Sequence, residues 1–108
     1  MEKVCEISDI PKGTVKGFTV KDTQILIANV DGNFYAIDAI CSHMHGYLPS
    51  GTLKRNIVIC PVHRAQFDVT SGKVSKDVSA AMRFILGGAK NMQTYQISVK
   101  ENQICVEL

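Results

Sequence analysis

Two short motifs concentrate residues that bind metal ions. Cys41 and His43 are separated by one residue in CSHMHGY, and Cys60 and His63 are separated by two residues in CPVH. Thiolate sulfur and neutral imidazole are both common metal ligands in proteins. The whole chain has only four cysteines and three histidines. Their concentration in two motifs therefore indicates one shared metal site.

The order of these ligands distinguishes between kinds of metal site. Structural zinc sites usually group two cysteines in one motif and two histidines in the other, whereas each motif here holds one of each. A 2Fe-2S cluster with two thiolates on one iron and two imidazoles on the other uses the same four side chains. An iron-sulfur cluster fits this order better than zinc does, and a zinc-stabilised interaction domain stays open as the alternative.

The segments around the motifs predict β-strands. Asp31-Gly32 predicts a tight hairpin turn between two of them. Cys60 lies at a predicted strand end and Pro61 prevents the strand from continuing, so both motifs are expected in loops. Turn residues recur at the spacing typical of a many-stranded all-β domain. The expected strands are residues 2–7, 14–20, 24–30, 34–38, 56–60, 67–74 (two strands interrupted at 71–72), 94–100 and 103–108.

One segment departs from this pattern. Val78, Ala81, Met82 and Ile85 have helix-like spacing. We therefore expect a short helix near residues 77–86.

Length and composition limit the class of protein. The 108 residues, with a net charge of +2 and 45% hydrophobic content, predict a single globular domain over residues 1–108. Scattered basic residues argue against nucleic-acid binding. The chain has no apolar run long enough to span a membrane, and its start does not resemble a signal peptide. We expect a cytoplasmic protein, in which cysteines are more often reduced or metal-bound than paired in disulfides.

The two motifs, in the segments CSHMHGYL and CPVHRAQFD, resemble the cluster-binding boxes of Rieske-type 2Fe-2S proteins. The resemblance implies that Cys41 and Cys60 bind one iron of a 2Fe-2S cluster and that His43 and His63 bind the other, with one cluster per chain. It also implies a fold of three small antiparallel sheets, in which two loops form a cluster-binding tip. That tip would belong to residues 38–75, and the remainder would form a β base.

Four positions within the resemblance indicate the low-potential ferredoxin type. Quinol-oxidising Rieske proteins carry a disulfide where this chain has Gly46 and Val62, and hydroxyl side chains where it has Ala65 and Phe67. Fewer hydrogen bonds to the cluster sulfurs lower the reduction potential. The expected potential is therefore about −150 mV, the low end of the Rieske range.

The function that the resemblance implies is electron transport. We expect a monomeric carrier, and not an enzyme, that meets its redox partner proteins transiently: a reductase, and an oxygenase or another terminal oxidoreductase. The alternative within the family is a small subunit that stays bound to a larger reductase of the nitrite reductase type.

Some nearby residues have simpler interpretations. His45 is expected to be an exposed loop histidine, and Cys5 and Cys105 are expected to be small buried hydrophobic residues in terminal strands. Lys54 and Arg55 predict an exposed turn, with the steering of an acidic partner as the alternative.

An apolar rim is a further alternative beside the first motif. Met44, Tyr47 and Leu48 could surround the cluster and contact a partner. We expect Met44 to be exposed and Leu48 to pack beneath its own loop.

Overall fold

The computed structural model describes residues 1–41, 46–62, 64–76 and 89–108. These described residues form antiparallel β-strands and two single-turn 3-10 helices. The elements are β1 (Glu2–Glu6), η1 (Ile7–Asp9), β2 (Val15–Val20), β3 (Thr23–Val30), β4 (Asn33–Asp38), η2 (Leu48–Ser50), β5 (Thr52–Lys54), β6 (Ile57–Ile59), β7 (Gln66–Asp68), β8 (Val74–Lys76), β9 (Thr94–Lys100) and β10 (Gln103–Glu107). No helix in this part of the chain has the length and apolar character needed to cross a bilayer.

The prediction of an all-β fold is confirmed, and each expected strand has a counterpart. Strand β5 was not predicted, because three residues are too few to show an alternating pattern. The predicted short helix near residues 77–86 falls on residues that lie outside the described part of the chain.

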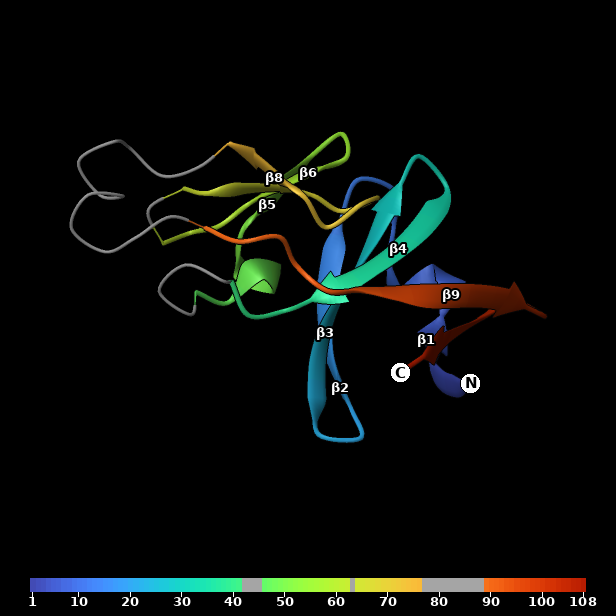
Figure 1. Cartoon of the computed structure of the whole chain (residues 1–108). Helices are drawn as coiled ribbons and strands as arrows, with labels where there is room; N and C mark the ends of the chain where they lie inside the picture. Colours follow the sequence, from blue (N-terminus) through green and yellow to red (C-terminus); the bar gives the residue numbers. More distant parts are fainter. Residues whose placement is uncertain (42–45, 63, 77–88) are drawn as a thin grey trace.

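The strands form a six-stranded sheet in the order β1-β10-β9-β4-β3-β2 and a four-stranded sheet in the order β5-β6-β7-β8 (Figure 1). The six-stranded sheet consists of two three-stranded units, which join where β4 and β9 pair through only two residue pairs. With the four-stranded sheet these units make three small antiparallel sheets, as the resemblance implied. Both termini lie at the β1 and β10 end of the molecule.

Strand β3 separates two hydrophobic cores. Because side chains alternate along a strand, Leu26 and Ala28 pack on one face of β3, while Ile25 and Ile27 pack on the other. The Leu26 face contacts residues of the four-stranded sheet and of both predicted metal-binding motifs. The Ile25 face contacts β1 and β10. A strand buried on both faces reads as a continuous apolar run, which explains the sequence ILIA.

The junction between β4 and β9 is reinforced by a side-chain hydrogen bond. The hydroxyl of Tyr95 donates to Oδ1 of Asp38 at 2.5 Å, and the backbone N–H of Asp38 donates to the carbonyl of Gln93 at 3.0 Å. Burial, together with the hydrogen bond and the negative charge of Asp38, raises the pKa of Tyr95 to about 12. The folded protein therefore holds the Tyr95 proton more tightly than the unfolded chain does.

The hydrogen bond at this junction predicts that the stability difference between the wild type and Tyr95→Phe depends on pH. Because the folded pKa of Tyr95 is raised above its unfolded value of about 10, its contribution to stability is fully present below pH 10 and is lost between about pH 10 and 12. At pH 8, Tyr95→Phe should lower the free energy of unfolding by about 1 kcal/mol. That deficit should shrink as the pH rises through this range.

Urea unfolding followed by circular dichroism from pH 8 to 12 measures this difference. Tyr35→Phe is the control, because it removes a tyrosine hydroxyl from β4 without touching the Asp38 and Tyr95 pair. A Tyr95→Phe deficit that stays constant to pH 12 would contradict the prediction.

Candidate metal centre

The two predicted cysteine ligands begin loops of the same design. The N–H of Cys41 donates to the carbonyl of Gly46 at 2.7 Å, and the N–H of Cys60 donates to the carbonyl of Ala65 at 2.8 Å. Each hydrogen bond joins a cysteine to the residue five positions later. Both cysteines therefore lie just outside the strands, as expected for loop residues, and each loop is closed at its base by a backbone hydrogen bond.

Short β pairings hold the ends of both loops. The first loop, residues 41–46, is bordered by a β-bridge between Ile40 and Tyr47. The second loop, residues 60–65, connects β6 to β7 and is bordered by the pair formed by Ile59 and Gln66. Each loop thus leaves a β pairing and returns to it, and this pairing fixes the position of the cysteine at the start of the loop.

Both cysteines are buried. Cys41 is 1% exposed and Cys60 is 0% exposed, and both belong to the hydrophobic core that contains Leu48 and Phe67. No disulfide joins the four cysteines of the chain, all of which lie in its described part. The two thiols therefore occupy an apolar, water-poor environment beneath the two loops.

The two loops meet at Gly46. A Cβ atom placed on Gly46 would lie 2.7 Å from Sγ of Cys60 and 3.2 Å from Cβ of Val62. Both separations are too short for an ordinary carbon contact, so this position has no room for a side chain unless its neighbours move. From the resemblance, Gly46 and Val62 were expected only to replace a disulfide, whereas in the structure they contact each other across the two loops.

The second loop also directs a backbone donor at the Cys60 sulfur. The N–H of Val62 donates to Sγ of Cys60 at 3.4 Å. Backbone donors to a cysteine sulfur stabilise its negatively charged thiolate form and tune a bound metal. Two buried cysteine sulfurs, a close approach made by glycine and a backbone N–H aimed at sulfur together fit an iron-sulfur cluster.

The histidine half of the predicted site is not described. His43 and His45 fall within residues 42–45, and His63 is also outside the described residues. The assignment of His43 and His63 as ligands, and of His45 as an exposed loop residue, therefore stays a prediction.

Residues beside the first loop agree with the sequence prediction where they are described. Leu48 is fully buried, so its predicted packing beneath the loop is confirmed. Tyr47 is 42% exposed. Met44, which was expected to be exposed, lies outside the described residues. Of the predicted apolar rim, the described part offers only the Tyr47 ring.

The other two cysteines lie in the β base. Cys5 is buried beside Ile104, and burial raises the pKa of its thiol to about 11. Its prediction as a small buried hydrophobic residue is confirmed. The same prediction for Cys105 is wrong, because Cys105 is half-buried and strand alternation places it on the opposite face of β10 from Ile104 and Val106.

Comparison with known proteins connects this geometry to a family. Over 102 residues the chain is 29% identical to the ferredoxin component of the naphthalene 1,2-dioxygenase system of Pseudomonas putida, covering 94% of this chain and 89% of the relative. It is 31% identical to the 3-phenylpropionate/cinnamic acid dioxygenase ferredoxin subunit of Shigella flexneri serotype 5b (strain 8401), covering 96% and 90% of the two chains.

A solved structure and a family model extend the comparison. The structure is a complex of reduced oxygenase and oxidized ferredoxin in carbazole 1,9a-dioxygenase, and the matched chain has a TM-score of 0.81 at 27% identity, with 97% of this chain and 99% of that chain covered. The family model described as Rieske [2Fe-2S] domain matches residues 1–96. The chain therefore belongs to the Rieske [2Fe-2S] domain family.

Proposed function

We propose that this protein is a Rieske-type ferredoxin that carries one electron from a reductase to an oxygenase or another terminal oxidoreductase. The observation that carries the proposal is the pair of buried cysteines, each opening a loop closed by the same backbone hydrogen bond, with the two loops in contact at Gly46. The similarity of this chain to ferredoxin components of dioxygenase systems extends over nearly their whole length.

The proposed ligands divide between the two loops. Cys41 and Cys60 would hold one iron and His43 and His63 the other, with one 2Fe-2S cluster per chain and residues 38–75 as the cluster-binding part. The cluster supplies the one-electron redox chemistry. The chain supplies burial of the two sulfurs, the Val62 N–H directed at Sγ of Cys60, and the ladders that hold both loops.

The partners follow from the relatives. Two relatives are named as ferredoxin components or subunits of dioxygenases, and a similar ferredoxin forms a complex with an oxygenase. An oxygenase is therefore the acceptor that we propose, in a transient and small contact of the kind that redox encounters make. We place the protein in the cytoplasm, where the thiols of Cys5 and Cys105 would stay reduced.

Replacement of the four proposed ligands tests the function. Anaerobically purified protein should contain two irons and two sulfides per chain and give a 2Fe-2S EPR signal after dithionite reduction. Cys41→Ser, Cys60→Ser, His43→Ala and His63→Ala should each lose most of the iron, because each removes one bond that holds the cluster.

The matched controls are Cys5→Ser, Cys105→Ser and His45→Ala, which should retain the cluster. Stoichiometric zinc in colourless wild-type protein would refute the electron-carrier proposal. Stable association with a large reductase subunit, seen by sedimentation of the copurified material, would instead identify the small-subunit alternative.

Contact between the loops predicts a specific effect of Gly46→Ala. The added methyl group would lie 2.7 Å from Sγ of Cys60, so the two loops must separate to accommodate it. The variant should bind substantially less iron than the wild type, measured as iron and sulfide per folded chain.

Gly13→Ala is the control for this substitution. Gly13 has a φ of +79° with no atom near the added Cβ, so alanine there adds backbone strain of about 1 kcal/mol without a clash. Gly13→Ala should lose stability but keep its iron. Normal iron content in Gly46→Ala would show that the loops do not need this close approach.

The reduction potential is expected near −150 mV, the low end of the Rieske range. Ala65 and Phe67 are fully buried and carry no hydroxyl group, so neither side chain can donate a hydrogen bond to a cluster sulfur. Ala65→Ser should raise the midpoint potential, because a hydroxyl donor stabilises the more negative reduced state.

Spectroelectrochemical titration measures this midpoint. Ala28→Ser is the control, because it adds a hydroxyl to the same hydrophobic core at a position on β3. A wild-type midpoint well above zero, or equal shifts in both serine variants, would contradict the hydrogen-bond explanation.

A further inference from the structure

The four-stranded sheet has an outer face with apolar residues at its centre. Val58 and Phe67 are fully buried and belong to the core beneath the loops. Because side chains alternate along strands, Ile57 and Ile59 of β6 project to the opposite face, where both remain half-buried. The outward face of an antiparallel sheet is usually polar, so two isoleucines there indicate a contact surface.

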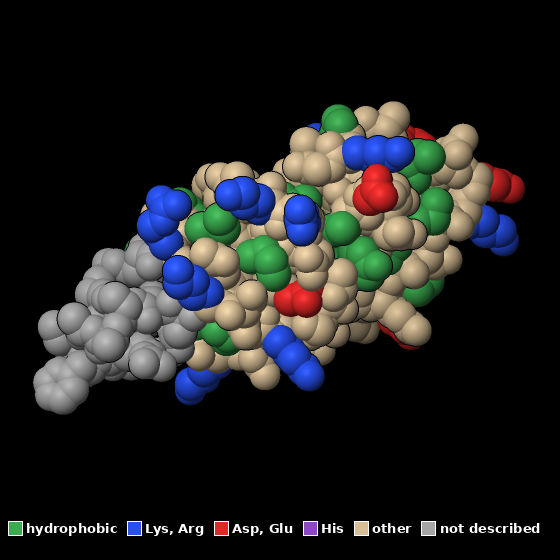
Figure 2. All heavy atoms as spheres, turned by 90° about the horizontal axis from the view of Figure 1, so that it is seen from above, with side chains coloured by type: hydrophobic (Ala, Val, Ile, Leu, Met, Phe, Trp, Pro, Cys, Tyr) green, Lys and Arg blue, Asp and Glu red, His purple; other side chains and the backbone are tan. Residues whose placement is uncertain are grey.

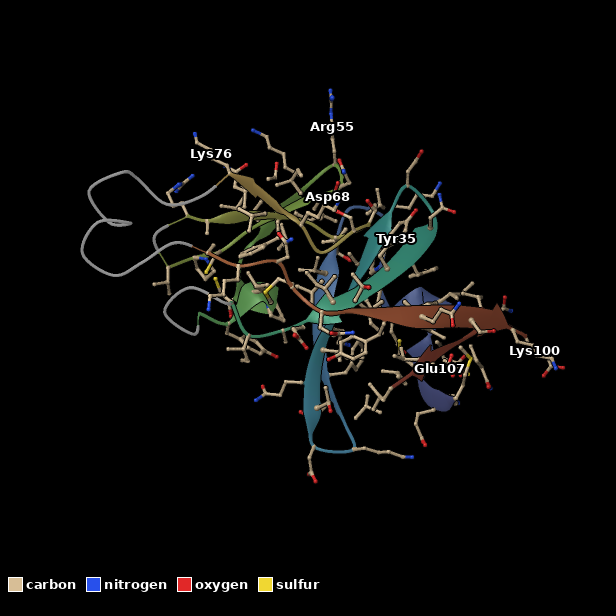
Figure 3. The ribbon with its side chains drawn as sticks, in the orientation of Figure 1. Tyr35, Arg55, Asp68, Lys76, Lys100 and Glu107 are labelled. Carbon is tan, nitrogen blue, oxygen red and sulfur yellow. The ribbon has the colours of Figure 1, made fainter. Side chains whose placement is uncertain are left out.

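These isoleucines lie in a concave surface bordered by cations. A concavity of about 640 Å³ is lined by Lys54, Arg55, Asn56, Ile57, Ile59, Arg64 and Gln66. Lys76 of β8 pairs in register with Gln66 and extends the same row of the sheet. Figure 3 shows Arg55 and Lys76 projecting away from the four-stranded sheet. We name the surface formed by these eight residues the cationic groove.

None of the salt bridges found in the described part of the chain involves a lysine or arginine of the cationic groove. The described salt bridges, Lys3 with Glu6 and Lys21 with Glu2, both lie in the β base. Asp68 is the acidic residue of the four-stranded sheet, and its pairing with Ile57 places it on the same outer face. Burial would raise the pKa of Asp68, but hydrogen bonds from Thr70 and Asn56 outweigh that effect and lower it. The Asp68 carboxylate is thus engaged by Thr70, which follows β7, and by Asn56 of the turn between β5 and β6.

Basic and acidic residues are also concentrated in different parts of the chain. Residues 46–76 contain five lysines and arginines and a single acidic residue, Asp68. Residues 1–40 and 91–108 contain five lysines and eight acidic residues. Figure 2 shows Lys and Arg side chains gathered over the end formed by the four-stranded sheet. The end that carries the two loops is therefore positive, and the β base is negative.

The cationic groove reaches the second loop. A neighbouring concavity of about 310 Å³ shares Lys54, Ile59 and Arg64 with it and is also lined by Cys60 and Pro61. A molecule that occupies the groove could therefore extend to the backbone that holds a proposed cluster ligand.

From this juxtaposition of an apolar centre, a cationic border and the Cys60 loop, we propose that the cationic groove docks an acidic, partly apolar protein surface of a redox partner. Charge complementarity selects an acidic partner, and Ile57 and Ile59 favour a protein segment over a small anion, which would leave them uncovered. That the partner is a redox protein rests on the proposed electron-carrier function. The charge and shape of the groove do not depend on it.

The probe for this proposal is a short fluorescein-labelled peptide of alternating glutamate and leucine. Its binding to the intact holoprotein is measured by fluorescence anisotropy in low salt and in about 150 mM NaCl. Wild-type protein should bind it in low salt and several-fold more weakly in 150 mM NaCl, where the Debye length is about 8 Å. A matched peptide with lysine in place of glutamate should not bind.

Two double variants with equal net charge separate the groove from general electrostatics. Lys54→Gln with Arg64→Gln should weaken binding about three- to tenfold, as expected for the loss of two exposed charge contacts. Lys16→Gln with Lys100→Gln changes exposed lysines of the six-stranded sheet and should have little effect. Lys54→Gln with Lys76→Gln repeats the test without altering the Cys60 loop, in case the Arg64 variant disturbs it.

Several results would overturn the proposal. These are equal binding by the groove and base variants, equal binding of the lysine peptide, and binding of inorganic phosphate or ATP where the acidic peptide does not bind. Iron, sulfide and EPR measurements on the same samples report the proposed electron-carrier function separately. A protein without a 2Fe-2S cluster that still binds the acidic peptide through the groove would refute that function and leave the acidic docking surface.

Discussion

The close approach of two loops is the constraint on which the rest of this structure depends. The loops at residues 41–46 and 60–65 come so near each other that Gly46 has no space for a side chain beside Sγ of Cys60. Such an approach needs both loops to be held from below. The N–H of each cysteine closes its own loop, and Leu48 and Phe67 fill the apolar space beneath. A backbone hydrogen bond closes each loop, and the shared hydrophobic core fixes the distance between the two loops.

The placement of β3 explains how a chain of this size supports such a tip. A small domain rarely has enough apolar surface for two independent cores. Here β3 serves both, because its alternating side chains pack toward the loops on one face and toward β1 and β10 on the other. The two halves of the protein are therefore coupled through one strand, and the narrow junction of β4 with β9 adds the hydrogen bond between Tyr95 and Asp38.

Residue pattern and spacing predicted most of the strands and the two loops, because alternation, turn residues and Pro61 act locally. The meeting of Gly46 with Cys60 could not be predicted in this way, since it depends on the tertiary approach of two segments. The partial exposure of Cys105 was missed because burial depends on which face of β10 the core covers. The cationic groove was missed for a related reason, since its cations come from separate segments: Lys54 from β5, Arg64 from the second loop and Lys76 from β8.

Divided charge suits a carrier that must meet a partner in one orientation and then leave. The long-range field of a molecule with a positive loop end and a negative base orients it before contact, which raises the rate of productive encounters more than it raises affinity. Exposed lysines and arginines add little binding energy each in physiological salt. The small apolar centre formed by Ile57 and Ile59 can then fix the docked position without making the complex long-lived. The charged residues thus orient the partner, while Ile57 and Ile59 on the same face fix the docked position weakly enough for the partner to leave.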